Sequence, residues 1–259
     1  MKIATGVALG LLTLLSSAAR LDAEPVKVRL TEGNSRGFLV LRTLEGKPLA
    51  HGELTQHPNG ALIENRLTLN FADGSLWDEQ VTYSQKGVFR LESYKHLQRG
   101  PSYPTSEVSF DRKSGRYQAR TQESKNAEVK EASGEMEMPA DLYNGMALVL
   151  LKNLPPGAVA SAQVAAFMPK PRLIKMDLSH EGDDHVRVGP ATKTARRYLA
   201  KLEVGGLIGL FASLMGKDPP DLRYWLAAGD VPAFVRFQGA MYLNGPVWRI
   251  EMAPVEWPK

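Results

Sequence analysis

Cysteine is absent from the 259 residues of this chain. The absence excludes disulfides, catalytic thiols, cysteine metal sites and a thiol for lipid attachment. The serine-hydrolase pattern G-x-S-x-G is also missing. Gly216-Lys217 is not part of a phosphate-binding loop, because Phe211 occupies the position of the first glycine and Asp218 that of the Ser or Thr. The sequence therefore predicts no cofactor, and it favours a binding protein over an enzyme.

Charge of one sign is in small excess. The chain has 32 Lys and Arg against 28 Asp and Glu, which gives a formal net charge of +4. It has no run rich in Lys or Arg, so the basic surface typical of nucleic-acid binding is not expected. An excess this small supports at most weak attraction to anionic surfaces.

A long hydrophobic run occurs at the N-terminus. Lys2 precedes an uncharged apolar run from Ile3 to Leu15, and the small residues Ser16 to Ala19 follow. This order is typical of a secretory signal peptide. We expect cleavage after Ala19, with Ala23 as the alternative, and a periplasmic or secreted mature protein spanning 24–259 as one domain. An uncleaved anchor is the alternative, but the run is shorter than the ~20 residues that span a bilayer. No transmembrane span is expected after cleavage.

The region 26–138 has the pattern of a β meander. Leu67, Leu69 and Phe71 alternate with polar residues, and Asp73-Gly74 then predicts a turn. The same alternation places the neighbours Asp78 and Glu79 on opposite faces of a strand, so they are not expected to act as a catalytic pair. The polar stretch 121–138 is either an exposed edge strand or a loop.

A helix is predicted from Asp141 to Asn153, because apolar residues recur at helical spacing and prolines flank the segment. Its wide apolar face predicts burial against a sheet. A second β region follows over 163–257, in which Arg223–Leu226, Phe234–Phe237 and Val247–Met252 form the last strands. Together these patterns predict a mostly β fold: a curved antiparallel sheet, open barrel or sandwich with the helix inside or across it.

The densest group of candidate metal ligands lies in the predicted hairpin turn Glu181–Asp184 and its flanks: His180, Asp183, Asp184 and His185. Histidines five residues apart do not share a helix face, so this is not the zinc-protease pattern H-E-x-x-H. Across a tight hairpin the two histidines would approach each other, and the carboxylates would attract a cation. The simpler interpretation is a solvated acidic turn.

The segment 205–216 is apolar, uncharged and rich in glycine. We interpret it either as a buried core helix or as a mobile flap over a ligand cavity, since glycine permits unusual backbone angles. Tryptophans are further candidates for the pocket wall, although such residues more often pack in a core or at its rim. The predicted ligand-binding residues are Leu207, Ile208, Leu210, Phe211, Leu214, Trp225 and Trp248.

The chain resembles a family of uncharacterised exported bacterial β proteins. Four turn-rich segments carry the resemblance: Phe71–Leu76, Gln98–Ser102, Pro169–Arg172 and Gly216–Asp221. The chain also resembles, in outline, the half-barrels of periplasmic lipoprotein and lipid carriers. That resemblance implies a curved sheet around a helix and an apolar cavity, but it supplies no catalytic residue.

The leading hypothesis is a periplasmic binding or carrier protein for an apolar, lipid-like molecule. One alternative is an envelope hydrolase that uses the His and Asp residues of 180–185. Another is a structural or assembly protein of the cell envelope, whose protein partners the sequence does not identify.

Overall fold

A computed structural model describes residues 25–155, 157–167, 170–188, 191–203, 220–242 and 245–253. Its elements are β1 (Ser35–Arg42), β2 (Pro48–Asn59), β3 (Leu62–Phe71), β4 (Leu76–Lys86), β5 (Val88–Arg99), β6 (Thr105–Asp111), β7 (Arg116–Gln122), β8 (Lys130–Glu135), α1 (Ala147–Asn153), β9 (Val159–Phe167), β10 (Pro171–Val188), β11 (Ala191–Glu203), β12 (Leu222–Ala227), β13 (Ala233–Ala240) and β14 (Val247–Met252). The predicted mostly β fold with one buried helix is confirmed.

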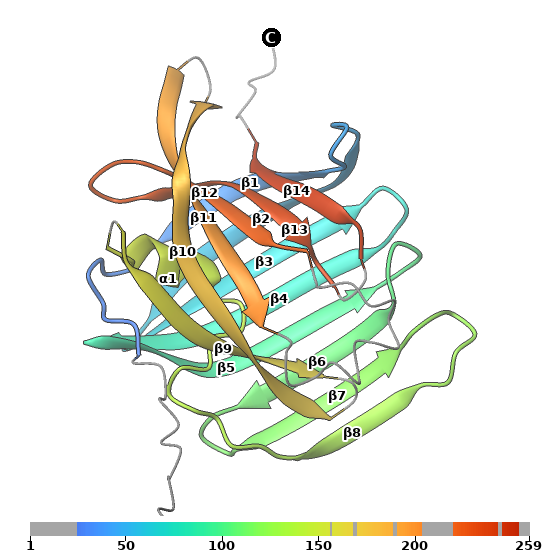
Figure 1. The fold of residues 1–259 in the computed structure, drawn as a ribbon. Helices are drawn as coiled ribbons and strands as arrows, with labels where there is room; N and C mark the ends of the chain where they lie inside the picture. The colour runs from blue at the N-terminus through green and yellow to red at the C-terminus, as the bar shows by residue number, and fades with distance from the viewer. Residues whose placement is uncertain are drawn as a thin grey trace, which may run out of the picture.

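All the strands belong to a single 14-stranded sheet, in the order β8-β7-β6-β5-β4-β3-β2-β1-β14-β13-β12-β11-β10-β9 (Figure 1). The two predicted β regions join where β1 pairs antiparallel with β14. The three predicted C-terminal strands are confirmed as β12, β13 and β14. Because β8 and β9 lie at opposite ends of this order, the sheet is open rather than a closed barrel.

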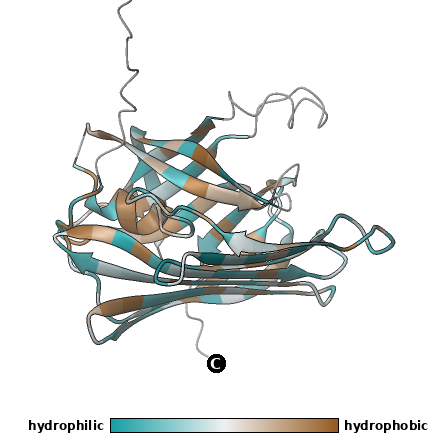
Figure 2. Cartoon of the chain, turned by 90° about the horizontal axis from the view of Figure 1, so that it is seen from below, coloured by the Kyte–Doolittle hydropathy of each residue, from teal (hydrophilic) through white to brown (hydrophobic). Residues whose placement is uncertain are grey.

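The sheet rolls up until its two ends meet through side chains. Phe167 on β9 contacts Phe110 on β6 and Tyr117 on β7, with ring centroids 6.0 and 5.7 Å apart. Helix α1 is strongly hydrophobic and lies between the two sides of the rolled sheet (Figure 2). Its buried residues Val149 and Leu150 belong to one apolar cluster with strands from both sides. Removing this apolar surface from water favours the rolled shape.

The predicted helix Asp141–Asn153 is shorter in the structure, where α1 covers its last 7 residues. Gly145 takes a left-handed conformation with φ +68°, which ends helical geometry there. The residues before Gly145 run along the open edge of β9 instead. Leu142 forms a parallel bridge with Gln163, whose carbonyl accepts a 2.8 Å hydrogen bond from the amide of Tyr143. Capping the edge in this way prevents pairing with another chain.

The opposite edge strand, β8, is exposed and carries charged side chains. Of the stretch 121–138, residues 130–135 therefore form the predicted edge strand, while 123–129 form the loop that connects β7 to it. The charges on this edge oppose pairing with another sheet.

The predicted hairpin turn at Glu181–Asp184 is wrong. Strand β10 runs through these residues for 18 positions, and the β10–β11 pairing extends to Val188 opposite Ala191. A β-bulge leaves Glu181 unpaired between His180 and Gly182. Cross-strand arginines neutralise the acidic residues, so a segment that looks like a turn is stable as a strand.

The segment before β1 is fastened to α1 by buried polar groups. The Glu32 carboxylate, 4% exposed, meets the Lys152 ammonium at 2.6 Å. The Asn153 side-chain oxygen accepts hydrogen bonds from the amides of Arg29 and Leu30 at 2.8 and 2.7 Å. The N-terminal segment is thus part of the packed fold. Among the described residues, no helix is long and apolar enough to span a membrane.

Candidate functional site

The predicted apolar residues Leu207, Ile208, Leu210, Phe211 and Leu214 lie outside the described residues. The two tryptophans of the same prediction lie on opposite faces of the sheet. Trp248 faces inward and contacts the rings of Phe71 and Tyr103 at 5.7 and 5.9 Å. Trp225 faces outward, where Arg236 stacks over its ring at 5.5 Å. The structure therefore does not bring these two side chains together.

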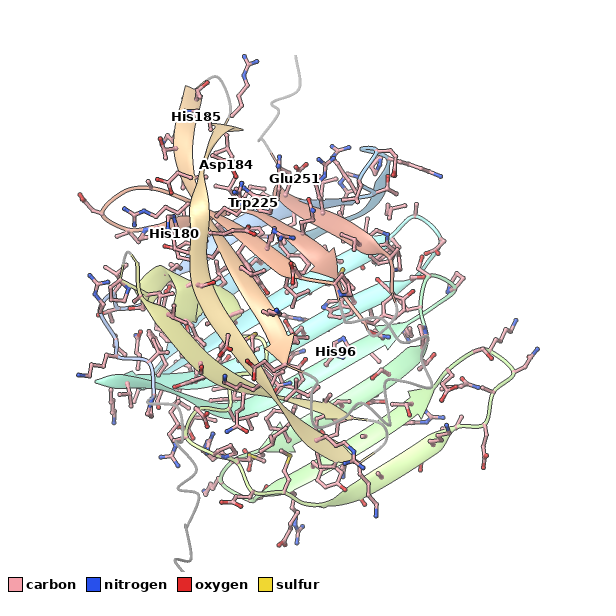
Figure 3. All side chains as sticks on the ribbon, viewed as in Figure 1. His96, His180, Asp184, His185, Trp225 and Glu251 are labelled. Atoms are coloured by element: carbon pink, nitrogen blue, oxygen red, sulfur yellow. The ribbon has the colours of Figure 1, made fainter. Side chains whose placement is uncertain are left out.

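The predicted metal ligands all lie on the single strand β10: His180, Asp183, Asp184 and His185 (Figure 3). Two of them meet, with His180 Nε2 3.0 Å from Asp183 Oδ1. Asp184 instead accepts hydrogen bonds from Trp225 Nε1 at 2.7 Å and from Arg197 at 2.5 Å, and these bonds lower its pKa. Within the described part of the chain, no three His, Asp or Glu side chains gather as metal ligands would.

The bulge at Glu181 anchors a network of ion pairs on the outer face. The Glu181 carboxylate accepts hydrogen bonds from Arg223 and Arg197, at 2.9 and 2.8 Å from their Nε atoms. These partners, Arg223 first, lower the pKa of Glu181. The network continues on β13 and β14, where Arg236 Nε lies 2.9 Å from Glu251. Each acid of the network has a cation beside it, which is typical of a structural network.

A groove of about 690 Å³ crosses the outer faces of β4 to β8. Exposed side chains of both signs line it, among them Lys95, Glu107, Arg120 and Glu131. Water competes for every polar contact at such a surface, so contacts there contribute little binding energy. The inner face of the sheet offers a better candidate site.

A row of four side chains crosses the inner face of β2 to β5. Register pairs the four in turn, and each is only partly buried: Leu54, Leu67, Glu79 and His96. We call them the midline row. The next residues along the strands on either side, such as Trp77 and Val81, are 7% and 3% exposed. Described side chains therefore leave the inner face incompletely covered along this row on β4 and β5, whereas on β2 and β3 the neighbouring Gly52 and Asn65 are partly exposed as well.

The midline row lies between two separate apolar clusters. One surrounds α1, and the other contains Trp77, Tyr103 and Trp248. On the facing side of the rolled sheet, the rings of Tyr224 on β12 and Phe237 on β13 are in contact, with centroids 5.0 Å apart, and each packs against a different cluster. Both remain partly exposed although they face inward. The incompletely filled layer thus has aromatic and aliphatic surface on both sides.

Glu79 is the acidic group of this layer. Its Oε1 accepts a 2.8 Å hydrogen bond from the Tyr94 hydroxyl, and its carboxyl group lies beside Gly145, where an added Cβ would be 3.2 Å away. Burial raises its pKa above the ordinary value, and the Tyr94 hydrogen bond only partly opposes this. The carboxylate in turn raises the pKa of the facing Tyr224, after burial itself.

His96 lies beside Glu79 in the register. Its ring packs on Trp77, with centroids 4.3 Å apart, and burial lowers its pKa from 6.5 to about 4. The His96 Nε2 and Trp77 Nε1 atoms are buried and have no hydrogen-bond partner among the described residues. Unpaired buried polar atoms are uncommon in proteins, and a water or ligand group beside these two would satisfy them.

Neither Glu79 nor His96 was predicted as a site residue. The expected separation of Asp78 and Glu79 is confirmed, since Asp78 faces outward and pairs with Arg66 at 2.6 Å. The alternation of the sequence could have identified Glu79, because it places this residue on the same, apolar face of its strand as Trp77 and Val81. A glutamate on an apolar face is a candidate functional residue, because removing a carboxyl group from water costs free energy.

No protein-family model matches the sequence, and no curated protein matches it either. Among solved structures, the chain is similar to the crystal structure of a β-barrel-like protein of the domain of unknown function DUF1849 from Brucella abortus. The similarity covers 87% of this chain and 98% of that one, with a TM-score of 0.42 and 10% sequence identity. A similarity of this size carries no information about the site.

Proposed function

We propose that the protein is an exported binding protein that carries an apolar, lipid-like molecule in the layer between its two core clusters. The observation that carries the proposal is the midline row, whose side chains point inward and yet remain partly exposed, while their neighbours along β4 and β5 are buried. Apolar surface left uncovered in an interior binds apolar molecules, with about 25 cal/mol gained for each Å² removed from water. Sites of this kind are mostly apolar with a few polar groups.

The surroundings of the layer support the same proposal. Leu202 near the end of β11 and Leu222 at the start of β12 are partly buried against the α1 cluster. The two strands flank the predicted apolar segment 205–216 in the sequence. The role of that segment as a flap over the ligand stays a prediction, since its residues lie outside the described structure.

Binding is tested with the neutral fluorescent probe N-phenyl-1-naphthylamine. The purified wild type is expected to bind the probe, and mass spectrometry of the native protein is expected to detect co-purified lipid. Leu67→Trp places a larger ring in the layer and should weaken probe binding about ten-fold or more, a change of about 1.4 kcal/mol in binding free energy. Thr68→Trp, its neighbour on the outer face, should bind like the wild type. A wild type that binds no probe and carries no lipid would overturn the proposal.

Export is tested by N-terminal sequencing of protein recovered from the periplasm. Cleavage after Ala19 would leave Arg20 as the first residue, and cleavage after Ala23 would leave Glu24. Both sites precede the first described contact of the fold, a 3.2 Å hydrogen bond from the Val26 amide to the Tyr143 hydroxyl. Either cut therefore leaves the packed N-terminal segment intact. Recovery of the uncut chain from the cytoplasm alone would contradict the expectation.

A further inference from the structure

Glu79 and His96 are cross-strand neighbours on the inner face, and neither hydrogen-bonds the other. Directly opposed residues have Cβ atoms about 4.5–5.5 Å apart, so the polar tips of both side chains are within reach of one small group. Tyr94 occupies Glu79 Oε1, and Oε2 accepts no hydrogen bond from a described residue. His96 Nε2 likewise lacks a described partner. The pair thus presents two unused hydrogen-bonding positions next to the partly exposed Leu67.

The charge of this pair decides what it accepts. No Lys or Arg among the described residues forms an ion pair with Glu79, which therefore lies in the interior with only a phenol as donor. Burial raises the pKa of Glu79 and lowers that of His96 to about 4, so burial favours the uncharged form of each side chain. A carboxyl oxygen accepts a hydrogen bond in either protonation state, and a neutral imidazole offers one donor and one acceptor nitrogen.

Resting on the proposed function, we infer that the bound apolar molecule carries an uncharged hydroxyl group that lies between Glu79 and His96. A hydroxyl group donates one hydrogen bond and accepts another, so it pairs with both neighbours at once. A carboxylate would bring a second acid beside Glu79 and would have to be stripped of water. An ammonium would have to be stripped of water, and it only donates hydrogen bonds, so it cannot accept one from His96.

The inference is tested with three molecules that share one chain and differ in the head group: 1-tetradecanol, tetradecanoic acid and tetradecylamine. Each is used to displace N-phenyl-1-naphthylamine from the purified full-length protein at pH 7. The alcohol is expected to bind about ten-fold more tightly than either charged molecule, because a well-placed hydrogen bond contributes about 1 kcal/mol and a charged head group adds a desolvation cost.

Two substitutions of Glu79 separate recognition of the head group from binding of the chain. Glu79→Gln keeps a donor and an acceptor and should retain the alcohol affinity within about three-fold. Glu79→Leu removes both and should weaken the alcohol about ten-fold while N-phenyl-1-naphthylamine still binds. Asp78→Asn, the outward neighbour, is the matched control and should change neither affinity.

The outcomes distinguish this inference from the proposed function. If neither the naphthylamine nor any tetradecyl molecule binds, the proposed function fails and the inference fails with it. If the naphthylamine binds and the acid or the amine equals or exceeds the alcohol, the inference is overturned while the apolar site stands. Retention of the alcohol preference in Glu79→Leu would also overturn it.

Discussion

The substitution His96→Leu connects the interior of the protein to the pH dependence of its stability. In the folded chain burial lowers the pKa of His96 from 6.5 to about 4. Between these values the unfolded chain binds a proton that the folded chain does not. The contribution of His96 to stability is therefore complete above pH 6.5 and is lost as the pH falls toward 4.

The size of the effect follows from the same two values. Each pKa unit corresponds to about 1.4 kcal/mol, so the wild type should lose about 3 kcal/mol between pH 7 and pH 4 that His96→Leu does not lose. Urea unfolding followed by circular dichroism at several pH values in this range measures the difference. Glu79 pairs with His96 and has a raised pKa, which by itself would make the protein more stable as the pH falls. The comparison is therefore repeated in a background in which both proteins also carry Glu79→Gln.

An exposed histidine supplies the control. His57 lies on the surface, where its ring meets the side chain of Asn34 at 3.2 Å. His57→Gln should leave the free energy of unfolding at pH 7 within about 0.5 kcal/mol of the wild type. If the wild type and His96→Leu lose the same free energy between pH 7 and pH 4, His96 is not buried as the structure places it, and the site loses its uncharged imidazole.

Two further predictions concern stability, and urea unfolding at pH 7 measures both. Lys152→Met leaves the 4% exposed carboxylate of Glu32 without its cation and should cost about 3–5 kcal/mol. The double variant Glu32→Gln with Lys152→Met should recover most of that loss, and equal losses in the single and double variants would refute the reasoning. Gly145→Ala should cost about 2–5 kcal/mol, since a left-handed alanine costs about 1–2 kcal/mol and overpacking adds about 1–3 kcal/mol. The added methyl would lie 2.5 Å from Val81 Cγ2, whereas Gly60→Ala, also at positive φ, meets no atom within 4 Å and should cost only the backbone part.

The sequence alone determined the class of the fold, because a period of two and regular turns leave few alternatives to an antiparallel sheet. It also placed Asp78 and Glu79 on opposite faces, which the ion pair of Asp78 with Arg66 bears out. These results depend on the geometry of a single strand, which is local. For the same reason the last three strands were located within a few residues of their bounds in the structure.

Local patterns failed where distant strands compensate for them. The acidic segment around Glu181 looked like a turn, but Arg197 and Arg223 on neighbouring strands stabilise it as part of β10. The first half of the predicted helix instead covers the edge of β9, a strand whose edge is open only because of its place in the sheet. Partners distant in sequence decided both outcomes.

The candidate site was decided by tertiary structure in the same way. Alternation shows that Glu79 lies on an apolar face, but not which strand the face will meet. Register places His96 beside it, and the roll of the sheet places β12 and β13 on the facing side. The pKa values of these groups depend on how deeply the groups are buried. Burial is set by all the residues packed around a group, so it is a property of the folded chain and not of any one segment of its sequence.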